Sequence, residues 1–326
     1  MHRRIAWIGA LLVVTFLLAL PQSSRAATEL RLGHTTPTDD AYHIGAMKFV
    51  ELVSKYTNNA VRIVVFPASQ LGGEREMIEA VKLGTLDMVL TTSAPISNFE
   101  PRFMLFDLPF LFRDNAYAHQ VLDGPIGQKV AAHMEPHGIK SLSWYESGFR
   151  NMYSVKKKIT SPDDLRGMKF RVMENPVYVS MFRALGASAV TIPSPEIYLS
   201  LQTGVVDAYE HPLGPYYSFK AYEVAKLAAL TGHTYTPVAL LINLKLFNQM
   251  PKAHQDAFLR AAHEGAVFER AFIAQNTEEF KAKLRPLGVQ FNEVDKRLFQ
   301  QKMGPVYKEF GPKVGADLIE AIVQSK

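Results

Sequence analysis

The chain has 326 residues, no cysteine, and 36 basic against 31 acidic side chains. The absence of cysteine excludes disulfides, thiol nucleophiles and a lipid anchor carried on cysteine. The net charge of +5 is too small to indicate binding to nucleic acid or to an anionic membrane surface. A chain of this length, with 48% hydrophobic residues, can bury a large core and usually divides into two domains.

The first 26 residues are predicted to be a signal peptide. Arg3 and Arg4 precede an uncharged run at 5–20, and Ser24 and Ala26 supply the small residues that a signal peptidase requires. The run is short for a membrane span, which needs about 20 residues, although an uncleaved anchor is the alternative. Cleavage after Ala26 would export a protein with 33 basic and 31 acidic residues, a net charge of +2.

Strands and helices are predicted to alternate along the first part of the exported chain. Apolar and amphipathic patterns indicate strands at 29–32, 62–66 and 86–90. Two helices separate them, one carrying Tyr42 and Phe49 on its apolar face, and one at 74–83 that Gly84 ends. The order βαβαβ predicts a parallel sheet covered on both faces.

The same pattern recurs in the second part of the chain. A strand at 169–172 is followed by a helix at 176–185 and by a further helix with Ser194 at its N-cap and Pro195 at its first position. Residues 202–207 then repeat the layout of 82–87, in which a glycine ends a helix and an aspartate precedes a strand. We therefore expect two similarly built α/β lobes.

A long helix is predicted at 254–285, where Phe258 and Phe268 belong to an apolar set and Pro286 ends the pattern. At about 1.5 Å per residue it would run roughly 48 Å, long enough to lie across both lobes. We expect lobe I at 27–147, lobe II at 148–237, and a return to lobe I with the long helix and C-terminal helices at 238–326. This α/β arrangement places a ligand cleft between the lobes.

Sequence motifs of enzymes are missing from the chain. It contains no Gly-x-Ser-x-Gly elbow, no Gly-x-Gly-x-x-Gly after a strand and no phosphate-binding loop. His133 and His137 have the spacing of metal ligands, but Pro136 interrupts the helix that would align them, which favours an exposed loop. We predict no catalytic residue, no metal and no cofactor.

Four side chains are candidates for contacting a ligand. Arg171 lies at the end of a strand, and its guanidinium offers two parallel donors that match a carboxylate, although spacing alone favours a solvated surface arginine. Arg150 could present a second cation. Glu74 in the first turn of a helix is better explained by its favourable interaction with the helix dipole, whereas His211 beside Pro212 is equally consistent with a ligand contact and with a turn residue.

Several segments resemble those of one family. They are FPASQLGGERE (66–76), LDM (86–88), FDLPFLF (106–112), LRGMKFRV (165–172), LGA (185–187), EIYLSLQTGVVD (196–207) and YEVAK (222–226). In this order they resemble TRAP transporter solute-binding proteins of the DctP type. The resemblance implies a two-lobed periplasmic binding protein that closes on an organic acid and delivers it to the subunits of an ion-gradient-driven membrane permease.

The resemblance also implies which residues border the ligand: Arg171, Arg150, Glu74, Asn175, His211, His34 and Ser93. Among them, Arg171 matches the family's arginine that pairs with the ligand carboxylate. Many relatives carry Glu-Asn-Pro where this chain has Glu210-His211-Pro212, and some have an aromatic residue at the position of Ser194. Both departures put the identity of the acid in doubt.

The expected ligand is a sugar acid such as a uronate or an aldonate, because Glu74, His211 and Asn175 can hydrogen-bond to several hydroxyls. A C4-dicarboxylate and a 2-oxo acid remain alternatives. Two alternatives belong to other functional classes. One is a binding protein that contacts a membrane sensor when it is loaded with ligand, and the other is a periplasmic enzyme. We expect a monomer that is not inserted in the membrane after signal cleavage and does not bind nucleic acid.

Overall fold

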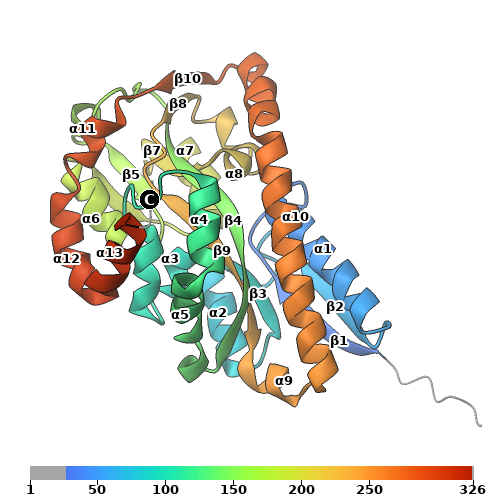
Figure 1. Ribbon diagram of the computed structural model, residues 1–326. Helices are drawn as coiled ribbons and strands as arrows, with labels where there is room; N and C mark the ends of the chain where they lie inside the picture. The colour runs from blue at the N-terminus through green and yellow to red at the C-terminus, as the bar shows by residue number, and fades with distance from the viewer. Residues whose placement is uncertain (1–26, 325–326) are drawn as a thin grey trace, which may run out of the picture.

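The computed structural model describes residues 27–324, so the predicted signal peptide lies outside the described residues. Helices pack around a central sheet, with the C-terminal helices and the long helix at opposite sides of the molecule (Figure 1). Within the described range, no helix is long and apolar enough to cross a membrane.

The N-terminal part of the chain has the predicted alternation of strands and helices. Its elements are β1 (Thr28–Gly33), α1 (Ala41–Tyr56), β2 (Val61–Phe66), α2 (Glu74–Leu83) and β3 (Met88–Thr92). β1 pairs in parallel with β2 on one side and with β3 on the other. The βαβαβ prediction is therefore confirmed, with the third strand starting at Met88 rather than at residue 86.

A second parallel unit follows further along the chain. Its elements are β5 (Lys169–Val172), α6 (Pro176–Ala184), β6 (Ser188–Thr191), α7 (Ile197–Gln202) and β7 (Ala208–Pro212). β5 pairs in parallel with β6 and with β7. The prediction for Ser194 is wrong, because this residue opens a 3-10 helix, η4 (Ser194–Glu196), after Pro193 and makes no capping hydrogen bond within the described structure. α7 begins only after that turn.

The repeated glycine and aspartate have the same role in both units. Gly84 and Gly204 adopt left-handed φ angles of 77° and 74°, which a residue with a side chain rarely adopts. Asp87 then accepts a hydrogen bond from the backbone N–H of Arg31 at 2.7 Å, and Asp207 accepts one from the backbone N–H of Lys169 at 2.9 Å. Each aspartate thus ties the start of one strand to the neighbouring parallel strand.

Several short elements lie between the two units or follow the second one. They are α3 (Ser93–Ile96), η1 (Pro101–Asp107), α4 (Asn115–Asp123), α5 (Pro125–Ala132), η2 (Glu135–His137), η3 (Pro162–Leu165), α8 (Leu213–Ser218), η5 (Ala221–Glu223) and α9 (Leu244–Gln249). η1 packs against α3, which follows the first unit, and against α6 of the second unit.

Three further strands join the units into one sheet. β4 (Ile139–Ser154) pairs antiparallel with β9 (Tyr235–Asn243) along most of its length and with β7 and β8 (Leu227–Leu230) towards its end. The strand order is β2-β1-β3-β9-β4-β7-β5-β6. The register of β4 shifts between Glu146 and Gly148, where Gly148 has a φ of 99°. The expected boundary between residues 147 and 148 therefore falls inside a single strand.

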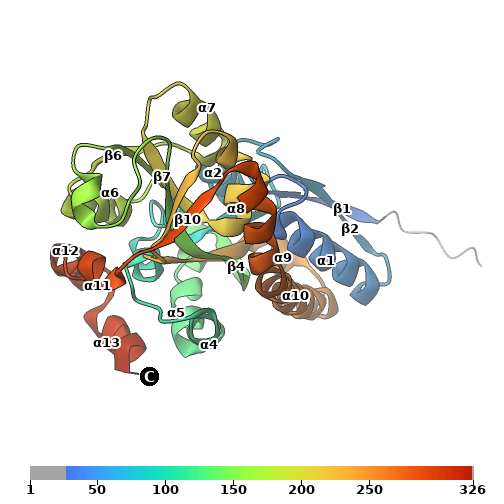
Figure 2. The same cartoon turned by 90° about the horizontal axis from the view of Figure 1, so that it is seen from above.

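The long helix α10 (Lys252–Leu284) has 33 residues and ends where η6 (Arg285–Leu287) begins. It packs against α1, β4 and α8, so it contacts both units, as predicted (Figure 2). Gly265 permits the close approach, because a Cβ there would lie 2.5 Å from Oη of Tyr145. Phe258 is buried, but Phe268 is 43% exposed, so the two do not share one apolar face as the spacing suggested.

The chain ends with β10 (Gln290–Glu293), α11 (Lys296–Gln300), α12 (Gly304–Val314) and α13 (Ala316–Gln324). β10 pairs in parallel with β8, and α12 packs against η1 and α6. These helices lie at the other end of the molecule from α1 (Figure 2). They therefore cover the second parallel unit and its junction with the first.

Candidate ligand-binding site

Arg150 and Glu210 form a buried ion pair between β4 and β7. Nη2 of Arg150 donates to Oε1 of Glu210 at 3.0 Å and to its carbonyl oxygen at 2.8 Å, and Nε also contacts Oε2. Nη1 donates to Oγ1 of Thr236 at 3.3 Å. Burial acts to lower the pKa of Arg150 and to raise that of Glu210, but their mutual attraction reverses both directions. All three guanidinium nitrogens of Arg150 thus have protein partners.

Arg171 on β5 is also buried, at 1% exposure, so the surface arginine that spacing alone favoured is wrong. Its Nε donates to the carbonyl oxygen of Ile192 at 2.7 Å, and its Nη1 lies 3.8 Å from Oε1 of Glu210. Nη1 has no hydrogen-bond partner among residues 27–324. Burial lowers the pKa of Arg171 to about 10, which leaves the guanidinium charged near neutral pH.

Arg150, Arg171 and Glu210 form a buried cluster in which two positive charges meet one negative charge. Glu210 is shared between two guanidiniums, and Nε2 of His233 lies 3.6 Å from its Oε2. Burial lowers the pKa of His233, which keeps this imidazole neutral near pH 7. An uncompensated buried cation is costly, so an anion placed beside Arg171 would be stabilised.

His211 lies next to Glu210 on β7 and is 7% exposed. Its Nδ1 has no hydrogen-bond partner within the described part of the chain, and its ring lies 5.7 Å from that of Phe219. Burial, followed by repulsion from Arg150 and Arg171, lowers its pKa well below the usual value. A neutral imidazole with a free ring nitrogen can accept or donate one hydrogen bond.

Glu74 occupies the first position of α2, as predicted, after Gly73. Its Oε1 accepts hydrogen bonds from Oγ1 of Thr91 at 3.1 Å and from the backbone N–H and Oγ1 of Thr92 at 2.8 and 3.0 Å. These bonds fix the carboxylate at the end of β3. The negative charge of Glu74 also acts to raise the pKa of Arg171.

Two other predicted residues converge on Asp107 at the end of η1. Oγ of Ser93 donates to Oδ1 of Asp107, and Nδ2 of Asn175 donates to Oδ2, both at 2.8 Å. All three side chains are buried. Ser93 and Asn175 are therefore joined to each other through a carboxyl that the sequence analysis did not single out.

His34 is committed to neighbouring side chains. Its Nε2 lies 3.1 Å from Nδ1 of His43, and its Nδ1 lies 3.2 Å from Oγ1 of Thr36. Burial, and then His43, lowers the pKa of His34 to about 3, so it is neutral near pH 7. Both ring nitrogens thus have protein partners, and neither is free for a ligand in this arrangement.

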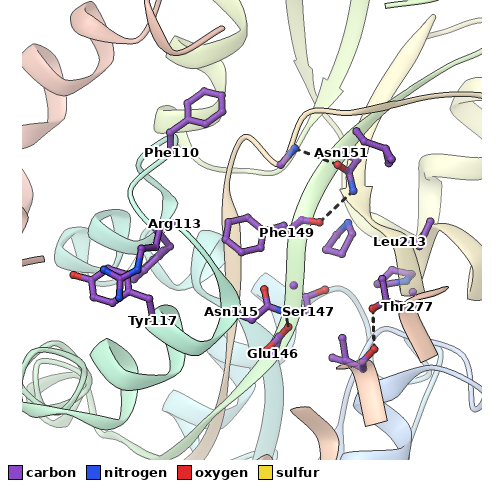
Figure 3. A pocket seen from close by; sticks show the side chains of 18 of the residues that line it. Phe110, Arg113, Asn115, Tyr117, Glu146, Ser147, Phe149, Asn151, Leu213 and Thr277 are labelled. Atoms are coloured by element: carbon purple, nitrogen blue, oxygen red, sulfur yellow. Dashed lines mark hydrogen bonds between the residues drawn. The ribbon is translucent and has the colours of Figure 1, made fainter. Parts of the chain in front are cut away.

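A cavity of about 730 Å³ lies beside β4, lined by Phe110, Arg113, Asn115 and Tyr117 on one side and by α10 on another (Figure 3). None of the seven predicted residues lines it. Phe149 and Asn151 of β4 face this cavity, and strand alternation places the side chain of Arg150 between them on the opposite face. The cavity is thus separate from the arginine cluster.

No group of three or more side chains that could hold a metal occurs among residues 27–324. His137 lies in η2, where its Nε2 is 3.4 Å from Oε2 of Glu100, and His133 ends α5. The two histidines thus belong to the connection between α5 and β4, in keeping with the loop that the sequence analysis favoured.

The chain matches the family model described as bacterial extracellular solute-binding protein, family 7 (DctP), over residues 32–313. The chain belongs to this family. A relative, the 2,3-diketo-L-gulonate-binding periplasmic protein YiaO of Escherichia coli K12, is 34% identical over 315 residues, which cover 95% of this chain and 96% of the relative. The resemblance to TRAP solute-binding proteins of the DctP type is therefore confirmed.

Two solved structures show the same two-lobed fold in TRAP solute-binding proteins. One, from Polaromonas sp. JS666 and bound to D-erythronate, is 37% identical with a TM-score of 0.89 and covers 91% of this chain and 98% of that one. Another, from Sulfurospirillum deleyianum with bound succinate, is 31% identical with a TM-score of 0.88, over 92% and 100% of the chains. The predicted fold class is confirmed.

Sequence analysis of this TRAP solute-binding protein missed three site residues. Glu210 was available in the tripeptide Glu210-His211-Pro212, and Asp107 in the segment FDLPFLF, but both were noted only as parts of motifs. His233 follows a glycine with no distinguishing pattern. Its role depends on a contact with Glu210, a long-range contact that no local signal indicates.

Proposed function

We propose that this TRAP solute-binding protein captures a sugar acid, such as a uronate or an aldonate, by pairing its carboxylate with Arg171. The observation that carries the proposal is the buried, charged guanidinium whose Nη1 has no hydrogen-bond partner among the described residues. A carboxylate placed there would complete the hydrogen bonds and balance the charge. Closure of the lobes would strengthen this ion pair by excluding water.

The side chains around Arg171 favour a ligand that also carries hydroxyl groups. His211 offers a free ring nitrogen, and the carboxylate of Glu74 can accept hydrogen bonds from hydroxyls. Relatives that bind D-erythronate and 2,3-diketo-L-gulonate support this choice.

A C4-dicarboxylate is the second candidate, since one relative holds succinate. A second carboxylate would need a second free cation, and the guanidinium of Arg150 is already paired with Glu210. Glu74 would in addition repel it. The geometry therefore favours a ligand with one carboxylate, a group that also includes the 2-oxo acids.

The wider role that we propose follows from the family. After removal of residues 1–26, the protein would act in the periplasm as a monomer, without cofactor, and deliver its ligand to TRAP permease subunits. A ligand-loaded contact with a membrane sensor is the alternative role. We propose a receptor rather than an enzyme, because the family to which the chain belongs is described as solute-binding and the buried cluster offers a binding cation.

A thermal-shift screen tests the ligand. Purified protein is heated with D-erythronate, D-galacturonate, D-glucuronate, succinate, 2-oxo acids and neutral sugars, because an acid that binds only the folded form raises the melting temperature. We expect hits among hydroxylated monocarboxylates, lost in Arg171→Ala and retained in Arg183→Ala, an exposed control. A hit that survives in Arg171→Ala would overturn the arginine pairing.

A further inference from the structure

Asn175 forms hydrogen bonds that link the two predicted lobes. It caps α6, where its Oδ1 accepts from the backbone N–H of Val177 at 2.8 Å. Its Nδ2 donates to Oδ2 of Asp107 at 2.8 Å, to Oγ of Ser97 at 3.0 Å and to the carbonyl oxygen of Ala94 at 3.3 Å. Both polar atoms of its side chain are therefore occupied.

The three partners of Nδ2 of Asn175 come from a distant part of the chain, before residue 147. Ala94 and Ser97 lie in and directly after α3, which follows β3 of the first parallel unit, and Asp107 ends η1. Asn175 follows β5 of the second unit. A neighbouring bond runs the same way, because Nδ2 of Asn98 donates to the carbonyl oxygen of Glu174 at 2.9 Å.

We infer that Asp107 and Asn175 form a latch that holds the lobes closed and sets how slowly a bound acid leaves. The inference rests on the proposed function, since it concerns closure around the same ligand. It also gives a role to the segment FDLPFLF, which supplies Asp107. Asp107 and Asn175 are positioning residues, because they act on the closed state and not on the ligand.

The two hydrogen bonds that Asp107 accepts differ in whether they cross between the predicted lobes. Ser93 and Asp107 both precede residue 147 and belong to the predicted lobe I, so parting of the lobes would keep their hydrogen bond and would break the bond that Asn175 of lobe II donates. A contact present only in the closed state shifts the equilibrium towards closure. Removing it speeds ligand release and leaves association with the open form unchanged.

The test compares release rates in a double-mutant cycle. Asn175→Ser keeps a side chain that caps α6 but is too short to reach Asp107, and Asp107→Ala removes the acceptor. The probe is whichever of D-erythronate, D-galacturonate and D-glucuronate gives the largest thermal shift with the wild-type protein. Stopped-flow measurements give the association and dissociation rate constants.

We expect each single variant to raise the dissociation rate constant about tenfold, the size of one buried hydrogen bond, with little change in association. The double variant should release the acid no faster than the faster single variant, because both remove one contact. Asn248→Ser at an exposed site is the control and should match the wild type. If either buried variant does not fold, Asn98→Ala at an exposed position breaks the neighbouring bond and should also speed release.

Two failures are distinguishable. If no acid of the three binds the wild-type protein, the proposed function fails and the latch with it. If an acid binds the wild-type protein but the variants release it at the wild-type rate, or their effects are additive, the latch alone is wrong.

Discussion

Nη2 of Arg150 lies 3.0 Å from Oε1 of Glu210, and neither side chain is exposed to solvent. The same Oε1 atom is 3.8 Å from Nη1 of Arg171. One carboxylate therefore compensates two guanidiniums that come from different strands.

Glu210→Gln should destabilise the protein strongly. The substitution keeps the shape but removes the nearest counter-charge of two buried guanidiniums, which costs about 3–5 kcal/mol of unfolding free energy. Urea denaturation measures the change. Asp163→Asn is the control, because Asp163 pairs with Arg166 at 2.9 Å on the exposed surface and such pairs contribute about 0–1 kcal/mol. Equal losses in the two variants would contradict this account of the cluster.

Arg171→Lys should weaken the binding of a sugar acid by about tenfold or more, although the charge is kept. A lysine presents a point charge instead of two parallel donors, and it loses the bond from Nε to the carbonyl oxygen of Ile192. Isothermal titration calorimetry measures the affinity, and Arg183→Lys serves as the exposed control. Affinity within a factor of two of the wild type would argue against paired hydrogen bonding at this position.

His211→Asn should change which acid binds best without abolishing binding. The side-chain amide of asparagine donates and accepts hydrogen bonds at positions that differ from those of the neutral imidazole, while Arg171 still pairs with the carboxylate. Ranking the acids of the thermal-shift screen for both proteins checks this. An unchanged ranking would show that His211 does not read the ligand.

Stability should fall as the pH rises towards 8 because of Asp107. Burial is the largest cause that raises the pKa of its carboxyl, which reaches about 8 in the folded protein. The folded state therefore favours the protonated form, and the associated stability is complete below the unfolded pKa and is lost as the pH rises through about 8.

Melting temperatures of the wild type and of Asp107→Asn between pH 5 and 9 test this prediction. Burial also raises the pKa of Asp40, to about 6, so the wild-type slope has more than one source and the difference between the two proteins isolates Asp107. The variant should lose less stability over the range. Parallel curves would show that Asp107 does not titrate there.

Gly148→Ala should destabilise the strand that joins the lobes. The φ angle of Gly148 is 99°, and a Cβ there would meet only ordinary contacts, so the cost comes from the backbone and amounts to about 1–3 kcal/mol. Thermal denaturation measures it. Gly304→Ala is the matched control, since its Cβ would have no neighbour within 4 Å among the described residues and its φ is not in the left-handed range. An equal loss of stability in both variants would argue against backbone strain at Gly148.

The sequence predicted elements well where the signal is local. Strand β5 and the glycine stops at Gly84 and Gly204 follow from patterns a few residues long. Burial of Arg171 did not follow, because alternation suggested one apolar and one open face. In the structure Phe170 and Arg171 are both buried, as expected for a strand covered on both sides.

The site was predictable only in part, because its contacts span long stretches of chain. Arg150 was expected to face the ligand, but its partner Glu210 lies 60 residues away. Asn175 was expected to contact the ligand, but its partner Asp107 lies 68 residues away. The type of a residue indicates what its side chain can bind. Which partner the side chain contacts depends on which distant segment the fold brings beside it.

Strand β4 belongs to both predicted lobes, so the chain cannot be divided between them without cutting a strand. A cut after residue 147 would divide this strand, which pairs with β9 on the side of one lobe and with β7 on the side of the other. Each fragment would expose an unpaired strand edge, and edges of this kind aggregate. Neither lobe should fold as a separately expressed fragment, and a circular permutant would tolerate new ends in surface turns but not here.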